Sequence, residues 1–300
     1  MRNNQTERID IYTQITNQIV EAIENGADSY TMPWHVSGAD SPLPVNAESH
    51  RAYRGINVMV LWAIAAKLNY ATNIWASYQQ WRELGAQVRK GEKSASVVFW
   101  KFPDEADADD EPTVEDETDK RRRSVIARAY HVFNSAQVDG YELPSIPRLP
   151  ESQRIERAET FFNGLGADVR EGGSRAFYEK QEDYIQMPPF SVFKQAEFRY
   201  SVLAHEITHW SGAAHRLNRD LAPRFQKEAY AAEELIAELG SAFVCAELDL
   251  GMEPRRDHAP YIESWLRALR NDKRAIFAAA AKAQQATDWL LERMSGAAAA

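Results

Sequence analysis

The stretch LAHEITHWSGAAH, residues 203–215, contains the pattern H-E-x-x-H, formed by His205, Glu206 and His209. The upstream run VFKQAEFRYSVLA has no Gly or Pro, so the sequence predicts a helix that continues through the motif and stops near Gly212. Residues four apart on a helix share one face, so both imidazoles can reach a single metal ion. Glu206 lies beside them and can take a proton from an attacking water. The motif therefore predicts a catalytic metal site, with Zn²⁺ as the first candidate and Mn²⁺ or Co²⁺ as alternatives.

A third protein ligand has two candidate sources. His215 fits the longer spacing H-E-x-x-H-x-x-G-x-x-H of metzincin-type enzymes. The other source is AYAAEELIAELGSAF, residues 229–243, whose apolar spacing predicts a helix packed in the core, where a carboxylate needs a partner. We favour Glu234, because Glu238 lies four residues further on and can orient a ligating histidine. Glu233 stays an alternative ligand, and Tyr230 is a candidate for stabilising an oxyanion.

The front half interleaves aromatic side chains with bases and amides, in RAYRGIN (51–57), WASYQQW (75–81), VRKGEK (88–93), VVFWK (97–101) and ARAYHVFN (127–134). Single-stranded nucleic acid stacks its bases on aromatic rings while Lys and Arg follow its phosphates. The first of these stretches precedes a predicted helix start, a place that suits phosphate. The candidate DNA-binding residues are Arg51, Tyr53, Arg54, Asn57, Arg89, Lys90, Lys93 and Lys101. Other aromatics are expected in the core, namely Trp62, Trp75, Trp81 and Phe99.

The net charge of −9 is unevenly distributed along the chain. Residues 104–119 carry ten acids and no base, whereas the rest of 1–148 holds 16 basic and 11 acidic residues. Residues 149–300 hold 19 basic and 23 acidic residues. Outside one acidic segment the front half is therefore mildly basic, which permits a polyanionic partner. Because that segment and the KRRR run at 120–123 fall between two predicted strands, we expect a long hairpin loop over 103–123.

The predicted fold class is α+β. Helices are expected over 6–25, 55–70 and 73–85, then a strand, a turn at Gly91 and a second strand within 86–102, and a further strand over 127–138. LPSIPRLPES, residues 143–152, has three prolines and predicts a linker at 146–152 between domains 1–145 and 153–295.

The second domain is predicted to be mostly helical. It should begin with a helix over 153–163 and short strands around ADVREG and DYIQMP. Helices near 194–211, 227–249, 258–270 and 272–293 follow. The segment EKQEDYIQMPP, residues 179–189, is interpreted as an edge strand able to pair with an extended substrate.

Cysteine usage and hydropathy indicate the compartment. The single cysteine, Cys245, cannot form an internal disulfide, and the start MRNNQTERID has no apolar stretch of a signal peptide. No apolar run approaches the roughly 18 residues of a membrane span. We therefore expect a cytoplasmic protein without a membrane partner.

The motifs also resemble a known family when they are read together. YRGIN, WASYQQW-x-x-x-GAQVRKGEK, VVFWK, YHVFN, D-x-IQMP, LAHEITHW-x-G and YA-x-EEL-x-AE resemble ArdC-type antirestriction proteins of conjugative plasmids, in matching order from about residue 6 to 292. The front half is also similar to the N-terminal region of TraC-type primases. The resemblance implies an N-terminal α+β domain that binds single-stranded DNA and a C-terminal zincin-like metallopeptidase domain of the gluzincin type.

The same resemblance implies a metal site and a function. The ligands would be His205, His209 and Glu234, and a histidine at the place of His215 is not part of the family motif. The implied role is to protect incoming plasmid DNA from host restriction during conjugation. A second hypothesis is a DNA-targeted metalloprotease that cleaves a DNA-bound or restriction protein. A third is a DNA mimic in which the acidic segment 104–119 occupies a restriction enzyme. The motif predicts a zinc metallopeptidase, while its activity and its substrate stay open.

Overall fold

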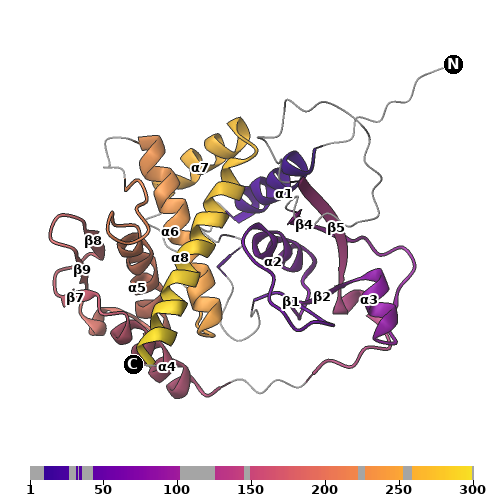
Figure 1. Ribbon diagram of the computed structural model, residues 1–300, viewed down its shortest axis with the longest axis horizontal. Coiled ribbons are helices and arrows are strands. Elements are labelled where there is room, and N and C mark those ends of the chain that lie inside the picture. Colours follow the sequence, from indigo (N-terminus) through magenta and orange to yellow (C-terminus); the bar gives the residue numbers. More distant parts are fainter. Residues whose placement is uncertain are drawn as a thin grey trace, which may run out of the picture.

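The computed structural model describes residues 10–26, 32, 34–35, 43–101, 126–144, 149–221, 227–252 and 259–298. The acidic segment 104–119, the KRRR run at 120–123 and residues 146–148 of the predicted linker lie outside the described residues. The hairpin loop over 103–123 and the division at 146–152 therefore stay predictions. The fold is α+β, as expected, with a sheet-containing front half and a largely helical second half (Figure 1).

The front half is built on a four-stranded sheet. Its strand order is β1-β2-β5-β4, from β1 (Val45–Asn46), β2 (Ile74–Ser77), β5 (Ile126–Asn134) and β4 (Ala95–Lys101). The long pair β4–β5 is antiparallel, in register from Ala95↔Val132 to Lys101↔Ile126. A small second sheet pairs β3 (Gln87–Val88) with β6 (Val138–Asp139). The short 3₁₀ helix η4 (Ser135–Gln137) connects β5 to β6.

The predicted helix over 73–85 is wrong in its first part. Residues 74–77 form β2, which pairs with β1 on one side and with β5 on the other. The helix α3 (Tyr78–Glu83) begins only after Ser77, whose side chain accepts from the backbone N–H of Gln80 while the Gln80 side chain accepts from the backbone N–H of Ser77. This capping box fixes the helix start at that point, and strand pairing decides the conformation before it.

Helix α2 (Ile56–Leu68) anchors the sheet. Its residues 56–63 are all buried, because the segment is apolar on every face. The Asn57 side chain replaces a strand partner at Val98, donating to its C=O and accepting from its N–H at 2.8 Å each. Helix α1 (Ile11–Gly26) packs against α2.

The second half consists of helices and a small sheet that packs beside α5 (Figure 1). Helix α4 (Glu151–Gly164) is followed by β7 (Asp168–Glu171), β8 (Phe177–Glu179), β9 (Tyr184–Met187) and the 3₁₀ helix η5 (Phe190–Val192). The four predicted helices are confirmed as α5 (Ala196–Ser211), α6 (Lys227–Glu247), α7 (Ala259–Asn271) and α8 (Ala275–Ala298). The sheet order is β7-β9-β8, so β9 is the central strand. The interpretation of 179–189 as an edge strand is therefore wrong, since β9 already has a neighbour on each side.

The two halves share one large hydrophobic core. Helix α1 packs against α7, and α2 packs against α8, which crosses the middle of the molecule (Figure 1). The rings of Trp62 on α2 and Phe243 on α6 lie 6.1 Å apart, and both are buried. Trp75 and Trp81 are buried as expected, but Phe99 is 47% exposed, which corrects its assignment to the core. In the part of the chain that the structure describes, no helix combines the length and hydropathy of a membrane span.

Candidate functional site

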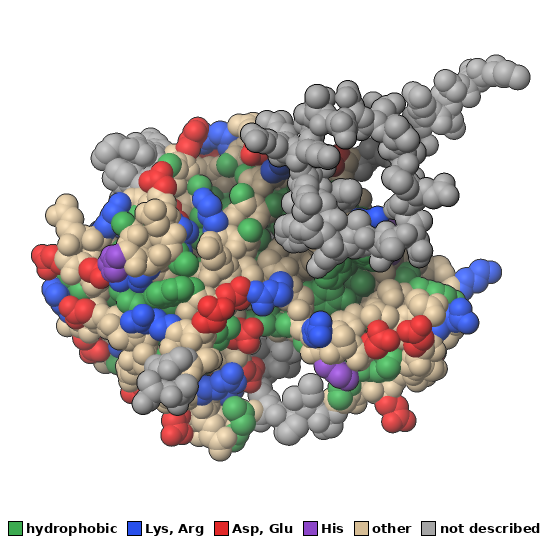
Figure 2. Space-filling model, viewed as in Figure 1, with side chains coloured by type: hydrophobic (Ala, Val, Ile, Leu, Met, Phe, Trp, Pro, Cys, Tyr) green, Lys and Arg blue, Asp and Glu red, His purple; other side chains and the backbone are tan. Residues whose placement is uncertain are grey.

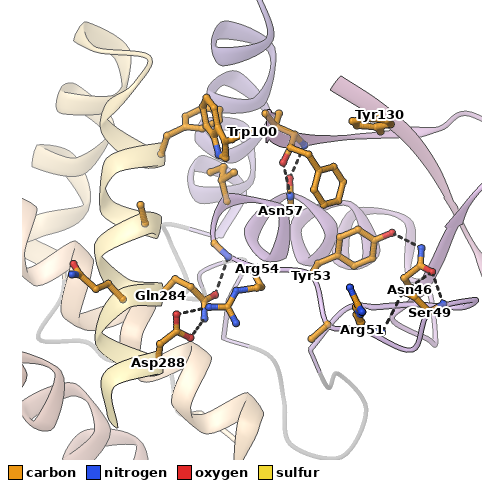
Figure 3. Close-up of a pocket in the computed structure, with 18 of the residues that line it drawn as sticks. Asn46, Ser49, Arg51, Tyr53, Arg54, Asn57, Trp100, Tyr130, Gln284 and Asp288 are labelled. Carbon is orange, nitrogen blue, oxygen red and sulfur yellow. Dashed lines mark hydrogen bonds and ion pairs between the residues drawn. The ribbon is translucent and has the colours of Figure 1, made fainter. Parts of the chain in front are cut away.

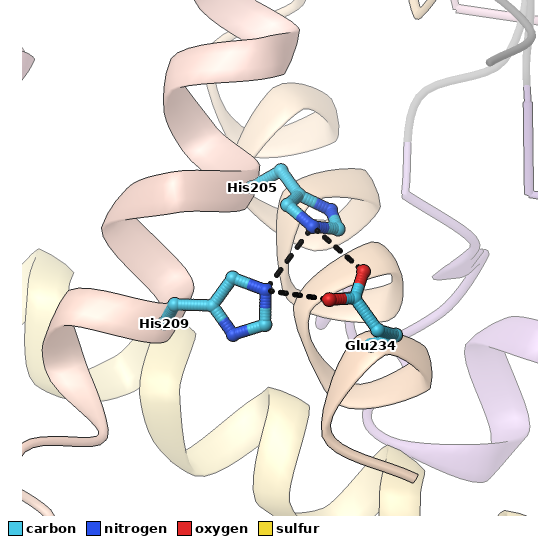
Figure 4. Close-up of side chains that lie close together, drawn as sticks. All are labelled: His205, His209 and Glu234. Carbon is cyan, nitrogen blue, oxygen red and sulfur yellow. Dashed lines mark hydrogen bonds and ion pairs between the residues drawn. The ribbon is translucent and has the colours of Figure 1, made fainter. Parts of the chain in front are cut away.

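Helices α5 and α6 bring three metal-ligating side chains together. The Nε2 atoms of His205 and His209 lie 3.2 Å apart, one turn from each other on α5. Glu234 comes from α6. Its Oε2 lies 3.5 Å from the Nε2 of His205, and its Oε1 lies 3.7 Å from the Nε2 of His209 (Figure 4). One ligand atom from each residue falls within 4.8 Å of the others. The structure therefore groups the two motif histidines with the glutamate that the sequence favoured.

The outer nitrogens of the two histidines each face a carboxylate. His205 Nδ1 lies 3.4 Å from Oε2 of Glu238, and His209 Nδ1 lies 3.3 Å from Oε1 of Glu233. A carboxylate at Nδ1 keeps the proton on that nitrogen and leaves the lone pair on Nε2. With a metal bound, each Nε2 would therefore offer its lone pair to the ion, whereas without metal the His205 ring donates a hydrogen bond to Glu234. Two imidazole nitrogens and one carboxylate form the donor set of a His₂Glu metal site, so these residues fit a divalent metal.

Glu233 is turned away from the ligand position by Arg219. The Arg219 guanidinium contacts the Glu233 carboxylate at 2.8, 3.2 and 3.3 Å, and both side chains are buried. Burial alone would raise the pKa of Glu233, but hydrogen bonds from His209 and Arg219 outweigh it, so the pKa lies below its usual range. Glu233 is therefore an anionic partner of His209, and the structure does not place it among the metal-ligating group.

Glu234 is held as a carboxylate by its surroundings. Burial raises its pKa, while the hydrogen bond from His205, the charges of the two histidines and the hydroxyl of Tyr230 lower it below its usual range. Tyr230 thus lies at the site, one turn before Glu234 on α6, as its spacing suggested. Glu206 follows His205 on α5 and is 4% exposed.

His215 lies outside the metal-ligating group. Gly212 ends α5, and the turn that follows carries His215 to the surface, where its side chain is 64% exposed. Its Nε2 lies 3.3 Å from Oδ2 of Asp183, which also pairs with Arg216. The metzincin spacing is therefore present in the sequence, but the structure does not bring His215 to the two motif histidines.

A groove lies between the front half and α8. Its volume is about 1420 Å³, and it is lined by the loop before α2, the ends of β4 and β5, and one face of α8 (Figure 3). Hydrophobic side chains gather in a hollow on this face of the molecule, with Lys and Arg side chains beside it (Figure 2). Contacts across the groove tie its two walls together: Gly55 N–H donates to Gln284 at 2.9 Å, and Arg54 pairs with Asp288.

The predicted DNA-binding residues divide into two groups. Four of them line the groove, namely Arg51, Tyr53, Arg54 and Asn57. Of these, Asn57 is occupied by the backbone of Val98, whereas Arg51 is exposed. Tyr53 is buried, and this burial raises the pKa of its hydroxyl.

Of the other predicted DNA-binding residues, Arg89, Lys90 and Lys93 do not line the groove. Arg89 pairs with Glu92 at 2.9 Å and with Asp139 at 3.4 Å. Lys90 and Lys93 are exposed near β3. The side chain of Lys101 lies outside the described residues.

Residues that the sequence reasoning missed complete the groove. Phe99 on β4 and Tyr130 on β5 are diagonal neighbours with ring centroids 5.4 Å apart, and they are 47% and 44% exposed. Trp100 leans toward Tyr12 and Phe277 and is 40% exposed. Strand alternation places Phe99 on the face of the buried Val97 and Tyr130 on the face of the buried Val132, so the sequence pattern gave no signal of their exposure.

Family models match both halves of the chain. The zincin-like metallopeptidase model matches residues 156–282, and the model of the N-terminal domain of anti-restriction factor ArdC matches residues 9–133. Two solved structures of a plasmid antirestriction ArdC protein are similar over the whole chain. The metal-free structure has 38% sequence identity and a TM-score of 0.77, covering 96% of this chain and 98% of that one. The Mn(II)-bound structure has 37% identity and a TM-score of 0.74, covering 95% and 98%.

Two curated relatives add further similarity. The chain is 54% identical to the uncharacterized protein y4eC of Sinorhizobium fredii over 288 residues, which cover 96% of this chain and 94% of that protein. It is 36% identical to the DNA primase TraC of Escherichia coli over 294 residues, covering 93% of this chain. The matched region is 27% of that primase, so the chain spans about a quarter of its length.

Proposed function

We propose, since the chain belongs to the ArdC family of antirestriction proteins, that it binds single-stranded DNA in the groove between β4–β5 and α8. By covering the strand, the protein would shield incoming plasmid DNA from host restriction during conjugation. The metallopeptidase domain accompanies this activity and is not required for shielding.

The main observation in support of this proposal is the exposed aromatic pair Phe99 and Tyr130 at the groove. Phe99 and Tyr130 are about half exposed, although their rings touch each other and buried valines lie next to them. Exposed aromatic rings at a groove of this kind mark a binding surface. A base stacked on an aromatic side chain contributes about 1–3 kcal/mol, and the ring accepts any of the four bases. The pair therefore suits a ligand bound without regard to sequence.

The remaining lining supports a polymer of nucleotides. The amide side chains of Asn46, Gln80 and Gln284 line the groove but are engaged in hydrogen bonds within the protein, whereas the exposed Arg51 can meet a phosphate. The acidic Asp288 on the opposite wall is neutralised by Arg54. The volume of about 1420 Å³ exceeds the roughly 300–1,000 Å³ of pockets for small molecules. These features favour an extended single strand over a small ligand.

The metal centre supports a second candidate function, a metalloprotease directed to a DNA-bound or restriction protein. His205, His209 and Glu234 would hold the ion, for which we propose Zn²⁺, with Mn²⁺ or Co²⁺ as alternatives. When bound, such a metal supplies Lewis acidity to a peptide carbonyl. Glu206 would accept the proton of the attacking water and return it to the leaving amine. The Tyr230 hydroxyl, already at Glu234, would donate to the developing oxyanion.

One experiment separates the two functions. Transfer of an unmethylated plasmid into restricting and non-restricting recipient cells is compared for three variants of the full chain. We expect Phe99→Ala with Tyr130→Ala to lose protection, Glu206→Gln to keep it, and Phe177→Ala, an exposed aromatic on β8, to match the unaltered chain. If protection instead survives in the groove variant and is lost in Glu206→Gln, shielding is wrong and proteolysis becomes the function.

A further inference from the structure

A buried carboxylate of the metal centre is held by side chains from the front half of the chain. Glu238 is fully buried on α6. Its Oε1 accepts a hydrogen bond from Nε1 of Trp34 at 3.3 Å and contacts Nε2 of His35 at 2.6 Å. Trp34 and His35 are more than 200 residues away in sequence, between α1 and β1, and both are buried. The site is therefore not built from the metallopeptidase half alone.

The tautomer of His35 follows from its other contact. The backbone N–H of Met32 donates to Nδ1 of His35 at 3.0 Å, so this nitrogen must carry a lone pair. In a neutral imidazole the proton then sits on Nε2, which donates to Glu238. With Trp34 as second donor, Oε1 of Glu238 receives two hydrogen bonds in a region without access to water. Such a doubly bonded, buried carboxylate has little freedom to rotate.

The second oxygen of the same carboxylate faces a metal-ligating histidine. Oε2 of Glu238 lies 3.4 Å from Nδ1 of His205, whose Nε2 points to Glu234 and His209. We propose that Trp34 and His35 are positioning residues of the metal centre. By fixing Oε1 of Glu238 they aim Oε2 at His205, and so they set the tautomer and orientation of that ligand.

The second motif histidine serves as an internal comparison. His209 is oriented by Glu233, which Arg219 holds within the same half of the molecule. In the described part of the chain, His205 is linked to the front half through Glu238, and His209 has no such link. Metal affinity should therefore respond to changes in the Trp34–His35 pair, although neither residue belongs to the metal-ligating group.

The test measures metal binding by the full chain. Zn²⁺ affinity is obtained by competition with a chromophoric chelator, and Co²⁺ is used separately for its visible absorption bands. Loss of a residue that orients a ligating histidine typically weakens metal binding by about 10–100-fold. We expect His35→Ala to show such a loss together with altered Co²⁺ bands. His35→Gln, whose amide can donate from nearly the position of Nε2, should restore most of the affinity. His50→Ala removes an exposed histidine of the same half and should leave the affinity unchanged.

Folding is checked in the metal-free state by circular dichroism and thermal unfolding. If His35→Ala fails to fold, Trp34→Phe decides the question, because it keeps a buried aromatic ring and removes the donor to Glu238. This variant should bind Zn²⁺ several-fold more weakly. A folded His35→Ala or Trp34→Phe with the Zn²⁺ affinity and Co²⁺ bands of the unaltered chain would overturn the proposal. The readout requires no DNA, so it is independent of the proposed binding of single strands.

Discussion

Replacing Arg219 by Met should destabilise the protein strongly at neutral pH and much less in mild acid. Arg219 and Glu233 are 4% and 7% exposed at their side chains, and the guanidinium supplies the carboxylate with three of its contacts. Methionine has a similar length but no charge. The variant therefore leaves the Glu233 carboxylate buried with His209 Nδ1 at 3.3 Å as its remaining partner among the contacts described above.

The loss of stability in Arg219→Met is limited by the cost of protonating the Glu233 carboxylate. The buried carboxylate can become neutral by taking up a proton. At pH 7 this costs about 3.7 kcal/mol for a group with an ordinary pKa of about 4.3. At pH 5 the same protonation costs about 1 kcal/mol. Arg219 also donates to Ser211 and to the carbonyl of Thr208, bonds that contribute about 1 kcal/mol at either pH. We therefore expect a loss of about 3–5 kcal/mol at pH 7 and about 1–2 kcal/mol at pH 5.

The assay is urea unfolding of the metal-free protein in a chelator at both pH values. The sign follows from linkage: in the variant the folded-state pKa of Glu233 is raised, so the destabilisation grows as pH rises above about 4.3. Arg267→Met is the matched control, because its partner Glu263 is 87% exposed and the pair should contribute less than about 1 kcal/mol. Adding Glu233→Gln to Arg219→Met should recover most of the loss. A loss below about 1 kcal/mol at pH 7, or an equal loss at both pH values, would refute the reasoning.

Three further predictions concern the groove, the excluded ligand and an ion pair at the surface. Phe99→Ala should weaken binding of a single-stranded 30-mer by about 5- to 150-fold, the equivalent of one lost base stack. The control Phe177→Ala on β8 should leave the Kd unchanged. Equal losses of affinity in the two variants would argue against DNA binding in the groove. His215→Ala should leave Zn²⁺ affinity unchanged in chelator competition, and a loss well beyond the roughly 10–100-fold of an orienting partner would return His215 to the ligand set. The Arg216 guanidinium holds the pKa of Asp183 below its usual range, although burial opposes it. The pair therefore stabilises the fold above the unfolded pKa of about 4 and loses that contribution as pH falls through the folded pKa. The difference in unfolding free energy between the unaltered chain and Asp183→Asn should shrink below pH 4, and a constant difference from pH 7 to pH 3 would contradict this.

Local patterns predicted which three side chains lie together as a possible metal-ligating group. The histidine pair depends on helical periodicity within five residues, and Glu234 was chosen because a buried carboxylate on a core helix needs a partner. Both inferences use short-range rules, and the structure brings these three side chains together. His215 shows the limit of a spacing rule, because Gly212 ends the helix before the spacing can be used.

The features that the sequence did not predict depend on contacts between residues far apart in the chain. Phe99 was expected in the core, but β4 is the last strand of its sheet, and Phe99 near its end is 47% exposed. The opposite wall of the groove comes from Gln284 and Asp288, more than 220 residues from their partners in the loop before α2. His35 belongs to no periodic pattern, so only the packing of the two halves reveals its contact with Glu238.

The central claim is that the chain binds single-stranded DNA, and fluorescence anisotropy tests it most directly. A labelled 30-mer, as a single strand and as a duplex, is titrated with the full chain at two salt concentrations. We predict tight binding of the single strand, clearly stronger than binding of the duplex and weakened by added salt. Equal affinity for both forms, or no binding of the single strand, would contradict the account and move proteolysis at the metal centre to first place.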